Sequence, residues 1–165
     1  MIGSIKEKLG FGKKIGEILG APIQGKVISV TEVNDPTFSE ELLGKGIAIV
    51  PYVGKVVAPI DGKIGMVFGT KHAITMTSDS GIEILIHIGL DTVTLEGAPF
   101  TTYVEADQRV KAGDLMLEFD IEAIKEAGLD VISPIVICNS DEYKEVQANT
   151  EQEVKALDPI LTLVK

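Results

Sequence analysis

Two histidines carry the chemistry that this chain could do. His87 lies near the end of an apolar run whose residues favour a β-strand, and Gly89 follows it two positions later. His72 is the only other histidine, and Thr70 lies two residues before it. An imidazole on a strand, with a second imidazole nearby, can pass on a phosphoryl group, bind a metal, or fill a place in the core.

The order of the segments predicts that the two histidines lie close together. Residues 79–81, Asp-Ser-Gly, are typical of a turn between two strands. Counting seven residues from Ser80 in each direction gives Ala73 and His87. A hairpin through this turn therefore sets His72 near the diagonal position to His87, within reach of a shared ligand.

Alternation along the run before Gly89 sorts its side chains onto two faces. Leu85, His87 and Gly89 share one face, and the isoleucines between them share the other. Gly89 is expected to leave space beside the imidazole for something to approach. Thr70 lies on the same face of an extended segment as His72, so its hydroxyl can fix which nitrogen of that ring is free.

The motifs favour phosphoryl transfer over the other chemistries that two imidazoles allow. A catalytic zinc usually has three protein ligands, and the chain contains no His-x-His and no His-Glu-x-x-His motif. It also contains no Gly-x-Ser-x-Gly of serine hydrolases and no Walker-type phosphate loop. Phosphoryl transfer needs one neutral imidazole nitrogen and a second group that stabilises charge on the phosphoryl oxygens. A histidine satisfied in the core remains an alternative for His87.

The elements that must position these residues are predicted to be short antiparallel strands. Turn residues cut the chain from residue 21 onward into apolar runs, which favours an all-β sandwich or barrel-sandwich with a few short helices. Asp61-Gly62 predicts a hairpin. Two helices are expected, at residues 39–43 and at 120–127, the second between an Asp120 N-cap and Gly128. Strands are predicted at residues 27–30, 46–50, 56–58, 64–68, 73–76, 82–88, 100–104, 115–119, 131–138 and 160–164.

Composition limits the partners and the compartment. Acidic residues exceed basic ones by 25 to 15, which disfavours binding to nucleic acid. The single cysteine excludes an internal disulfide and fits a reducing compartment.

With no apolar run of 18 residues and no signal peptide, we expect a cytoplasmic domain at residues 21–165. Residues 1–20 are expected to form a flexible, amphipathic segment. Its first fourteen residues, which include four lysines, could make weak contact with the inner face of a membrane.

Several motifs together resemble the glucose-type enzyme IIA domain of the bacterial phosphoenolpyruvate:sugar phosphotransferase system. Residues 81–93, which contain His87, look like the phosphorylation-site signature of that family, and residues 70–73 look like its second-histidine motif. Residues 21–25, 44–51, 58–62, 108–114 and 133–136 support the resemblance. It covers residues 21–165.

The resemblance implies an antiparallel β-sandwich and a role for each site residue. His87 would accept phosphate from phosphorylated HPr and pass it to a cysteine of enzyme IIB, which serves the IIC sugar permease. His72 would stabilise the phosphoryl group, and Thr70 would orient His72. No cofactor is required, but the two histidines can hold zinc when a regulated partner supplies a further ligand.

The resemblance also implies a docking surface with an apolar centre and an acidic fringe. Such a surface suits a protein that meets several partners in turn, among them regulated transporters or kinases, and we expect a monomer that keeps it free. The apolar centre consists of Phe38, Leu42, Leu43, Phe68 and Leu85, and the fringe consists of Asp35, Asp91 and Asp141.

Two positions depart from the family pattern. Lys45 stands where an acidic residue is common, and Asp107 stands where a turn glycine is usual. Asp tolerates a left-handed backbone better than most residues do.

Three other interpretations of the function stay open beside that of a phosphocarrier. Residues 57–64 and 109–116 have the form of the turn-strand segments in biotinyl or lipoyl carriers, but no lysine stands at a hairpin tip. The others are a zinc-dependent hydrolase on a related β fold and a purely regulatory binding module. The sugar that would be transported cannot be read from the chain, which is expected to hold only the IIA unit.

Overall fold

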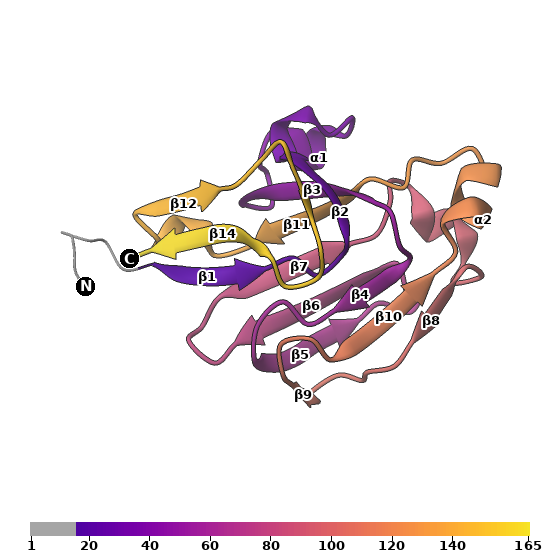
Figure 1. Ribbon diagram of the computed structural model, residues 1–165. Helices are drawn as coiled ribbons and strands as arrows, with labels where there is room; N and C mark the ends of the chain where they lie inside the picture. The colour runs from indigo at the N-terminus through magenta and orange to yellow at the C-terminus, as the bar shows by residue number, and fades with distance from the viewer. Residues whose placement is uncertain (1–15) are drawn as a thin grey trace.

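Short strands are the main regular structure of residues 16–165, the part of the chain that this computed structural model describes (Figure 1). The strands are β1 (Glu17–Gly20), β2 (Gly25–Ser29), β3 (Lys45–Pro51), β4 (Lys55–Val57), β5 (Gly62–Val67), β6 (Ala73–Ser78), β7 (Glu83–His87), β8 (Phe100–Thr102), β9 (Arg109–Val110), β10 (Leu115–Phe119), β11 (Ser133–Ile137), β12 (Glu145–Ala148), β13 (Gln152–Val154) and β14 (Pro159–Val164). All of the strand pairs are antiparallel. The predicted all-β class is confirmed.

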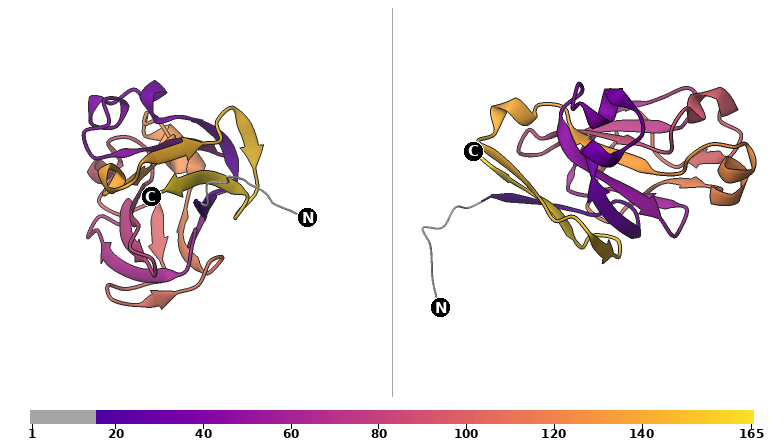
Figure 2. Two further views of the ribbon diagram at one scale, coloured as in Figure 1. Left: turned by 90° about the vertical axis from the view of Figure 1, so that its left-hand side faces the viewer. Right: turned by 90° about the horizontal axis from the view of Figure 1, so that it is seen from above.

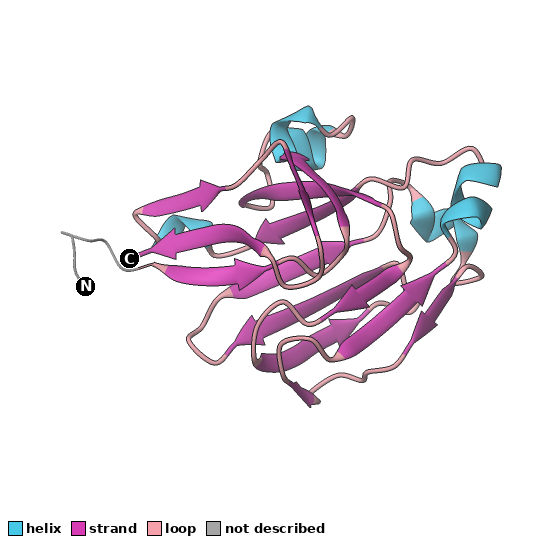
Figure 3. Cartoon of the chain, viewed as in Figure 1, coloured by secondary structure: helices cyan, strands magenta, loops and turns pink. Residues whose placement is uncertain are grey.

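Helices are few, short and set at the margins of the sheets (Figure 3). They are α1 (Pro36–Ser39), α2 (Ile121–Glu126) and the 3₁₀ turns η1 (Val30–Glu32), η2 (Thr92–Leu95) and η3 (Ser140–Glu142). The Asp120 carboxylate caps α2 by accepting from the Ala123 amide at 3.1 Å, as predicted. The other predicted helix is misplaced: Asp35 caps α1 and Pro36 starts it, and Glu41, with φ +58°, cannot continue it.

One large sheet and two small ones enclose the core. The large sheet has eight strands in the order β13-β2-β3-β11-β7-β6-β5-β9, and the small sheets are β1-β14-β12 and β4-β10-β8. Figure 2 shows the layers from two further sides. One buried apolar cluster joins them: Ile84 and Ile86 of β7 pack in it together with Leu161 of β14 and Met116 of β10. Each small sheet therefore covers part of one face of the large sheet.

The opposite face of the large sheet carries a second apolar cluster. Leu85 on β7 packs there with Phe38 of α1, Ala73 of β6 and Val136 of β11. The alternation predicted along β7 is thus confirmed, because its isoleucines face the main core and Leu85 faces the other side. His87 follows Leu85 at the same parity and lies at the edge of this second cluster.

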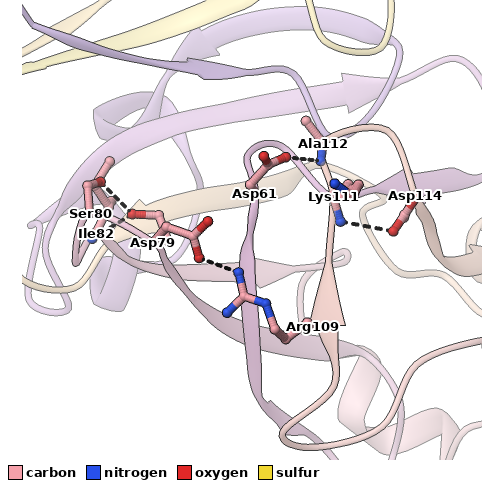
Figure 4. A network of polar contacts seen from close by, with 9 residues as sticks. Asp61, Asp79, Ser80, Ile82, Arg109, Lys111, Ala112 and Asp114 are labelled. Atoms are coloured by element: carbon pink, nitrogen blue, oxygen red, sulfur yellow. Dashed lines mark hydrogen bonds and ion pairs between the residues drawn. The ribbon is translucent and has the colours of Figure 1, made fainter.

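The β6–β7 hairpin has the predicted register, in which Ala73 lies opposite His87. At its turn, the buried Ser78 hydroxyl accepts a hydrogen bond from the Ile82 amide at 2.9 Å. Arg109 donates to the Asp79 carboxylate at 2.7 Å (Figure 4). This turn lies at the opposite end of the hairpin from both histidines.

The hairpin predicted at Asp61-Gly62 is wrong. β4 pairs with β10, whereas β5 pairs with β6 and β9, so the chain crosses from one sheet to another at this point. The Asp61 carboxylate accepts instead from the Ala112 amide at 2.8 Å (Figure 4). The two carrier-like segments do lie together, since the Ala58 amide donates to the Asp114 carbonyl at 2.9 Å.

The domain begins before residue 21. Residues 17–20, which the sequence placed in a flexible segment, form β1, and Leu19 lies opposite Leu161 of β14. The predicted amphipathic segment and the membrane contact of residues 1–14 lie outside the described residues. Within residues 16–165, no helix is long and apolar enough to cross a membrane.

Candidate functional site

The two imidazoles meet edge to face at one end of the β6–β7 hairpin. Their ring centroids are 4.9 Å apart and the ring planes are inclined by 83°. His72 directly precedes β6 and His87 is the last residue of β7. The backbone joins the two strands there as well, because the Ile88 amide donates to the His72 carbonyl at 2.8 Å. The predicted closeness of the two rings is confirmed.

The backbone fixes the tautomer of His87. Its Nδ1 lies 2.8 Å from the carbonyl oxygen of Gly89. Since a carbonyl oxygen only accepts hydrogen bonds, Nδ1 must carry the proton. A neutral His87 therefore has its lone pair on Nε2, which is the nitrogen free to act as a nucleophile or as a ligand.

Gly89 makes this contact possible by its backbone and not by leaving empty space. Its φ is +73°, and a Cβ there would lie 2.6 Å from Cγ2 of Thr92 and 2.9 Å from the Asp130 carbonyl. The expectation that Gly89 leaves room for an approaching group is wrong, because buried neighbours fill that room. The residue is needed so that the turn can aim its carbonyl at the imidazole.

Thr70 holds the other ring, as predicted. Its Oγ1 lies 2.7 Å from Nδ1 of His72, so Nε2 of this ring is also left unused by the contact. The Phe68 ring contacts His72 edge-on, with centroids 5.5 Å apart. Lys71, between Thr70 and His72, has φ +61°, a conformation that lets the chain turn sharply between the two side chains.

Burial keeps both imidazoles neutral. Desolvation lowers the pKa of His87 to about 4, assisted by His72, while the Gly89 carbonyl and the Asp35 and Asp91 carboxylates oppose the shift. Burial also lowers the pKa of His72 from its usual value. Near neutral pH each neutral imidazole therefore offers one nitrogen lone pair and one N–H group, and takes up no proton itself.

The surface around the site is apolar, but its predicted members contribute unequally. Leu42 and Leu43 are 68% and 42% exposed, whereas Phe38 and Leu85 are almost fully buried. The Phe38 ring nevertheless lies against His87, with centroids 5.0 Å apart. Phe68 is half-buried against the second apolar cluster. Of the five residues predicted for the apolar centre, Leu42 and Leu43 are therefore the most exposed, and their role in docking stays a prediction.

Two of the three residues predicted for the acidic fringe act on the site. Asp35 and Asp91 are near enough to His87 to act on its charge. Asp141 lies in η3, which follows β11, and its part in the fringe stays a prediction.

The sequence analysis did not identify the residues that hold the turn after His87. The Gly89 amide donates to Oγ of Ser133 at 3.3 Å, and the Leu90 amide donates to the Asp130 carbonyl at 3.0 Å. On the other side of the turn, Oγ1 of Thr92 donates to the Ile88 carbonyl at 2.5 Å. Ser133 stands 44 positions from Gly89, so no local spacing could have pointed to it.

The pair of histidines is not a complete metal site by itself. Within residues 16–165, no group of three or more His, Cys, Asp or Glu side chains is placed to hold a metal ion. The two free Nε2 atoms are suitable zinc donors, but a structural or catalytic zinc site takes three or four protein ligands.

Comparison with known proteins points to one family. A model of the phosphoenolpyruvate-dependent sugar phosphotransferase system EIIA 1 family matches residues 17–143, a segment that starts at the first residue of β1. The chain is 46% identical over 136 residues to a glucose-specific EIIA component of Oceanobacillus iheyensis, and the match covers 82% of each chain.

A longer relative and a solved structure agree with this. The chain is 46% identical over 147 residues to a β-glucoside-specific EIIBCA component of Bacillus subtilis, covering 89% of this chain and 24% of that protein. The chain thus spans about a quarter of that relative's length. The fold matches that of glucose permease IIA from Mycoplasma capricolum with a TM-score of 0.82 at 37% identity, over 89% and 95% of the two chains.

Proposed function

The chain belongs to the EIIA 1 family of the phosphoenolpyruvate-dependent sugar phosphotransferase system, and on that premise we propose that His87 is the residue that carries the phosphoryl group. Proteins of this family are phosphocarriers of the glucose type, components of a phosphotransferase chain. The observation that supports His87 is its hydrogen bond to the Gly89 carbonyl, which leaves Nε2 as the nucleophile.

The phosphoryl group is transferred in two steps, first from a histidine nitrogen of HPr to His87 and then from His87 to a cysteine sulfur. The lone pair of His87 Nε2 attacks the phosphorus of phosphorylated HPr, and the P–N bond of the donor histidine breaks as its imidazole leaves. The sulfur of an enzyme IIB cysteine then attacks the same phosphorus, and the bond to His87 breaks. Nδ1–H of His87 stays bonded to the Gly89 carbonyl throughout and stabilises the positive charge on the phosphorylated ring.

His72 stabilises the transferred group. When the Thr70 hydroxyl donates to Nδ1 of His72, the proton of that ring resides on Nε2, from which it can donate to a phosphoryl oxygen. The ring centroids are 4.9 Å apart, so a phosphoryl group on His87 would lie close to the His72 ring. His72 then acts by charge stabilisation in the transition state, and Thr70 acts by orienting it.

The same face receives donor and acceptor in turn. Exposed Leu42 and Leu43 supply apolar contact, and Asp35 and Asp91 favour a basic rim on the partner. Enzyme IIB and the IIC permease are the proposed acceptors because the Bacillus subtilis relative is an EIIBCA component. Transporters or kinases regulated by phosphorylation state would use this face as well.

A zinc ion fits this pair only in a complex. When the Thr70 hydroxyl instead accepts from Nδ1 of His72, both Nε2 atoms carry lone pairs, so two imidazole ligands are available. The remaining ligands would have to come from a partner, since two imidazoles do not complete a zinc site. Zinc would then be bound by ligands from both proteins and would hold a partner on the docking face, and no step of the transfer needs it.

The test is a reconstituted phosphorylation. The protein is incubated with phosphoenolpyruvate, enzyme I and HPr, and its intact mass is measured before and after acid treatment. We expect one added phosphoryl group that acid removes, and none in the His87→Gln variant. An unchanged mass with active HPr would refute the proposal, and zinc content and lysine adducts would then test the hydrolase and carrier alternatives.

A further inference from the structure

Two successive peptide groups in the turn after His87 each have two fixed partners. The peptide between Gly89 and Leu90 accepts from His87 Nδ1 through its carbonyl at 2.8 Å and donates to the Asp130 carbonyl through its N–H at 3.0 Å. The preceding peptide, between Ile88 and Gly89, accepts from Thr92 Oγ1 at 2.5 Å and donates to Ser133 Oγ at 3.3 Å. Both peptide planes are therefore held from two sides.

The Ser133 side chain is fully buried behind the site. Its exposed fraction is 0%, and its own proton is committed because Oγ donates to the Val131 carbonyl at 2.9 Å. The hydroxyl therefore meets Gly89 only as an acceptor. Ser133 begins β11, the strand that pairs with β7, and β3 flanks it on the other side opposite Ile49. Its position is thus fixed by a central strand.

Glycine makes this external support necessary. Gly89 has φ +73°, and a glycine passes between backbone conformations more easily than any other residue. The Gly89 carbonyl belongs to the following peptide, and rotation about the N–Cα bond of Gly89 would turn it away from the imidazole. Ser133 accepts from the Gly89 amide and so fixes the nitrogen end of that bond, while the Asp130 carbonyl holds the Leu90 amide beyond it.

We propose that Ser133 is a positioning residue that keeps the proton of His87 on Nδ1, by holding the amide nitrogen of Gly89 so that the carbonyl of the same residue stays turned towards the ring. The proposal rests on the proposed function in one respect, namely that Nε2 of His87 is the nucleophile. Ser133 acts through Gly89, at a distance from the transferred group.

The chain offers a matched control at the other end of the same hairpin. Ser78 is also a buried serine whose hydroxyl accepts a backbone hydrogen bond, from the Ile82 amide at 2.9 Å. Ser133→Ala and Ser78→Ala each leave a backbone N–H without its acceptor, and so have similar costs in stability. Only the first lies behind His87, so a difference between them at the imidazole cannot arise from lost stability.

The test reads the tautomer directly, in the full-length unphosphorylated protein labelled with ¹⁵N in histidine. NMR at pH 7.5 gives the ratio of Nδ1–H to Nε2–H for His87. We expect the Nε2–H form to rise several-fold in Ser133→Ala, and the rate of phosphoryl acceptance from HPr to fall about tenfold. Ser78→Ala should keep the native ratio and rate, and Ser133→Thr, which retains the hydroxyl, should restore both.

A second variant guards against loss of the fold in Ser133→Ala. Thr92→Val removes the hydroxyl that holds the carbonyl of the same Ile88–Gly89 peptide, and should shift the ratio in the same direction. A native ratio in both variants, or an equal shift in Ser78→Ala, overturns the proposal. If wild-type His87 takes up no phosphoryl group, the proposed function fails while the tautomer ratio still decides the role of Ser133.

Discussion

The two ends of the β6–β7 hairpin are built from the same pair of strands and have opposite characters. At the turn end, exposed charges find partners: Asp79 pairs with Arg109, and Ser80 donates to the Glu17 carboxylate. At the other end, the buried His72 and the half-buried His87 lie beside aromatic rings, and within residues 16–165 neither ring is bonded to a counter-ion. The charged groups at the turn end have partners, whereas at the histidine end the contacts to Thr70 and Gly89 leave the Nε2 atoms without one of these bonds.

This difference shows how one scaffold can hold reactive groups without becoming unstable. The turn end closes the hairpin and ties it to the segment at residues 109–114, so it fixes the strands (Figure 4). The histidine end then needs no ion pairs for its own rigidity, because its strands are already aligned. Its polar contacts go to the Nδ1 atoms alone, which sets the direction of each ring and leaves both Nε2 atoms free.

The largest expected effect is at the nucleophile. His87→Gln should reduce phosphoryl acceptance by more than about 10³-fold, because an amide cannot replace the imidazole as a nucleophile. Asp79→Asn, at the turn end, should leave acceptance unchanged. Intact mass after incubation with HPr measures both. Full acceptance in His87→Gln, with loss in His72→Gln, would reverse the roles assigned to the two rings.

His72→Gln should separate the two transfer steps. Acceptance from HPr should persist, but onward transfer to enzyme IIB should slow by about 10²-fold, since the amide is a weaker stabiliser of charge in the transition state. Rapid-quench kinetics with labelled phosphoryl donor would measure each step. Equal loss in both steps would show instead that His72 mainly supports the fold around His87.

The glycines at the two ends of β7 give a comparison in stability. Gly89→Ala should cost about 3 kcal/mol or more in the free energy of unfolding, because its Cβ would meet Thr92 and the Asp130 carbonyl at φ +73°. Gly81→Ala, at φ +101° with no atom within 4 Å of the Cβ, should cost about 1–2 kcal/mol of backbone strain alone. Urea denaturation would measure both, and equal costs would contradict the packing described around Gly89.

Acid should weaken the protein through its histidine end. The unfolded chain binds a proton at His87 near pH 6.5, whereas burial holds the folded pKa at about 4, so the unfolded state gains protons first as the pH falls. Stability should drop between pH 6.5 and 4, by an amount on the order of 3 kcal/mol from His87. His72 contributes with the same sign. Denaturation at a series of pH values should show a flatter profile in His87→Gln, and an unchanged profile would refute the assignment.

The smallest effect is expected at the ion pair of the turn end. Arg109 and Asp79 have side chains that are 66% and 55% exposed, so their attraction is screened by water. Arg109→Gln should cost less than about 1 kcal/mol, and salt should reduce the difference from wild type further. Denaturation at low and high ionic strength would measure it. A loss of unfolding free energy comparable to that of Gly89→Ala would show that the polar network in Figure 4 contributes more to stability than an exposed ion pair does.

Local patterns predicted the central strands and the hairpin that carries the site. The register followed from one turn, because a two-strand hairpin leaves its ends no freedom once the turn is fixed. Asp107, at a position typical of glycine in the resembled family, has φ +70°, as its side chain permits. β12 and β13 were not predicted, since these strands are rich in Glu and Gln and need an apolar partner on one side only.

Contacts between distant segments could not be predicted from one sequence. Asp61-Gly62 has the form of a hairpin turn, but the Asp61 carboxylate binds the Ala112 amide and the strands on either side join different sheets. The support of the histidine turn by Asp130 and Ser133 has the same origin. Side-chain chemistry pointed to the residues proposed to react, whereas contacts beyond the local sequence decide which nitrogen of His87 is left free to do so.

The site stands on a central strand and not on a loop, and this has a consequence for binding. β7 is paired on both sides, with β6 and β11, inside a sheet that is buried on both faces. A partner that docks here meets a surface that is already in its final shape, so little conformational entropy is lost on association. Complexes can then be short-lived and still accurate in geometry, which is what rapid relay of a group between successive partners demands.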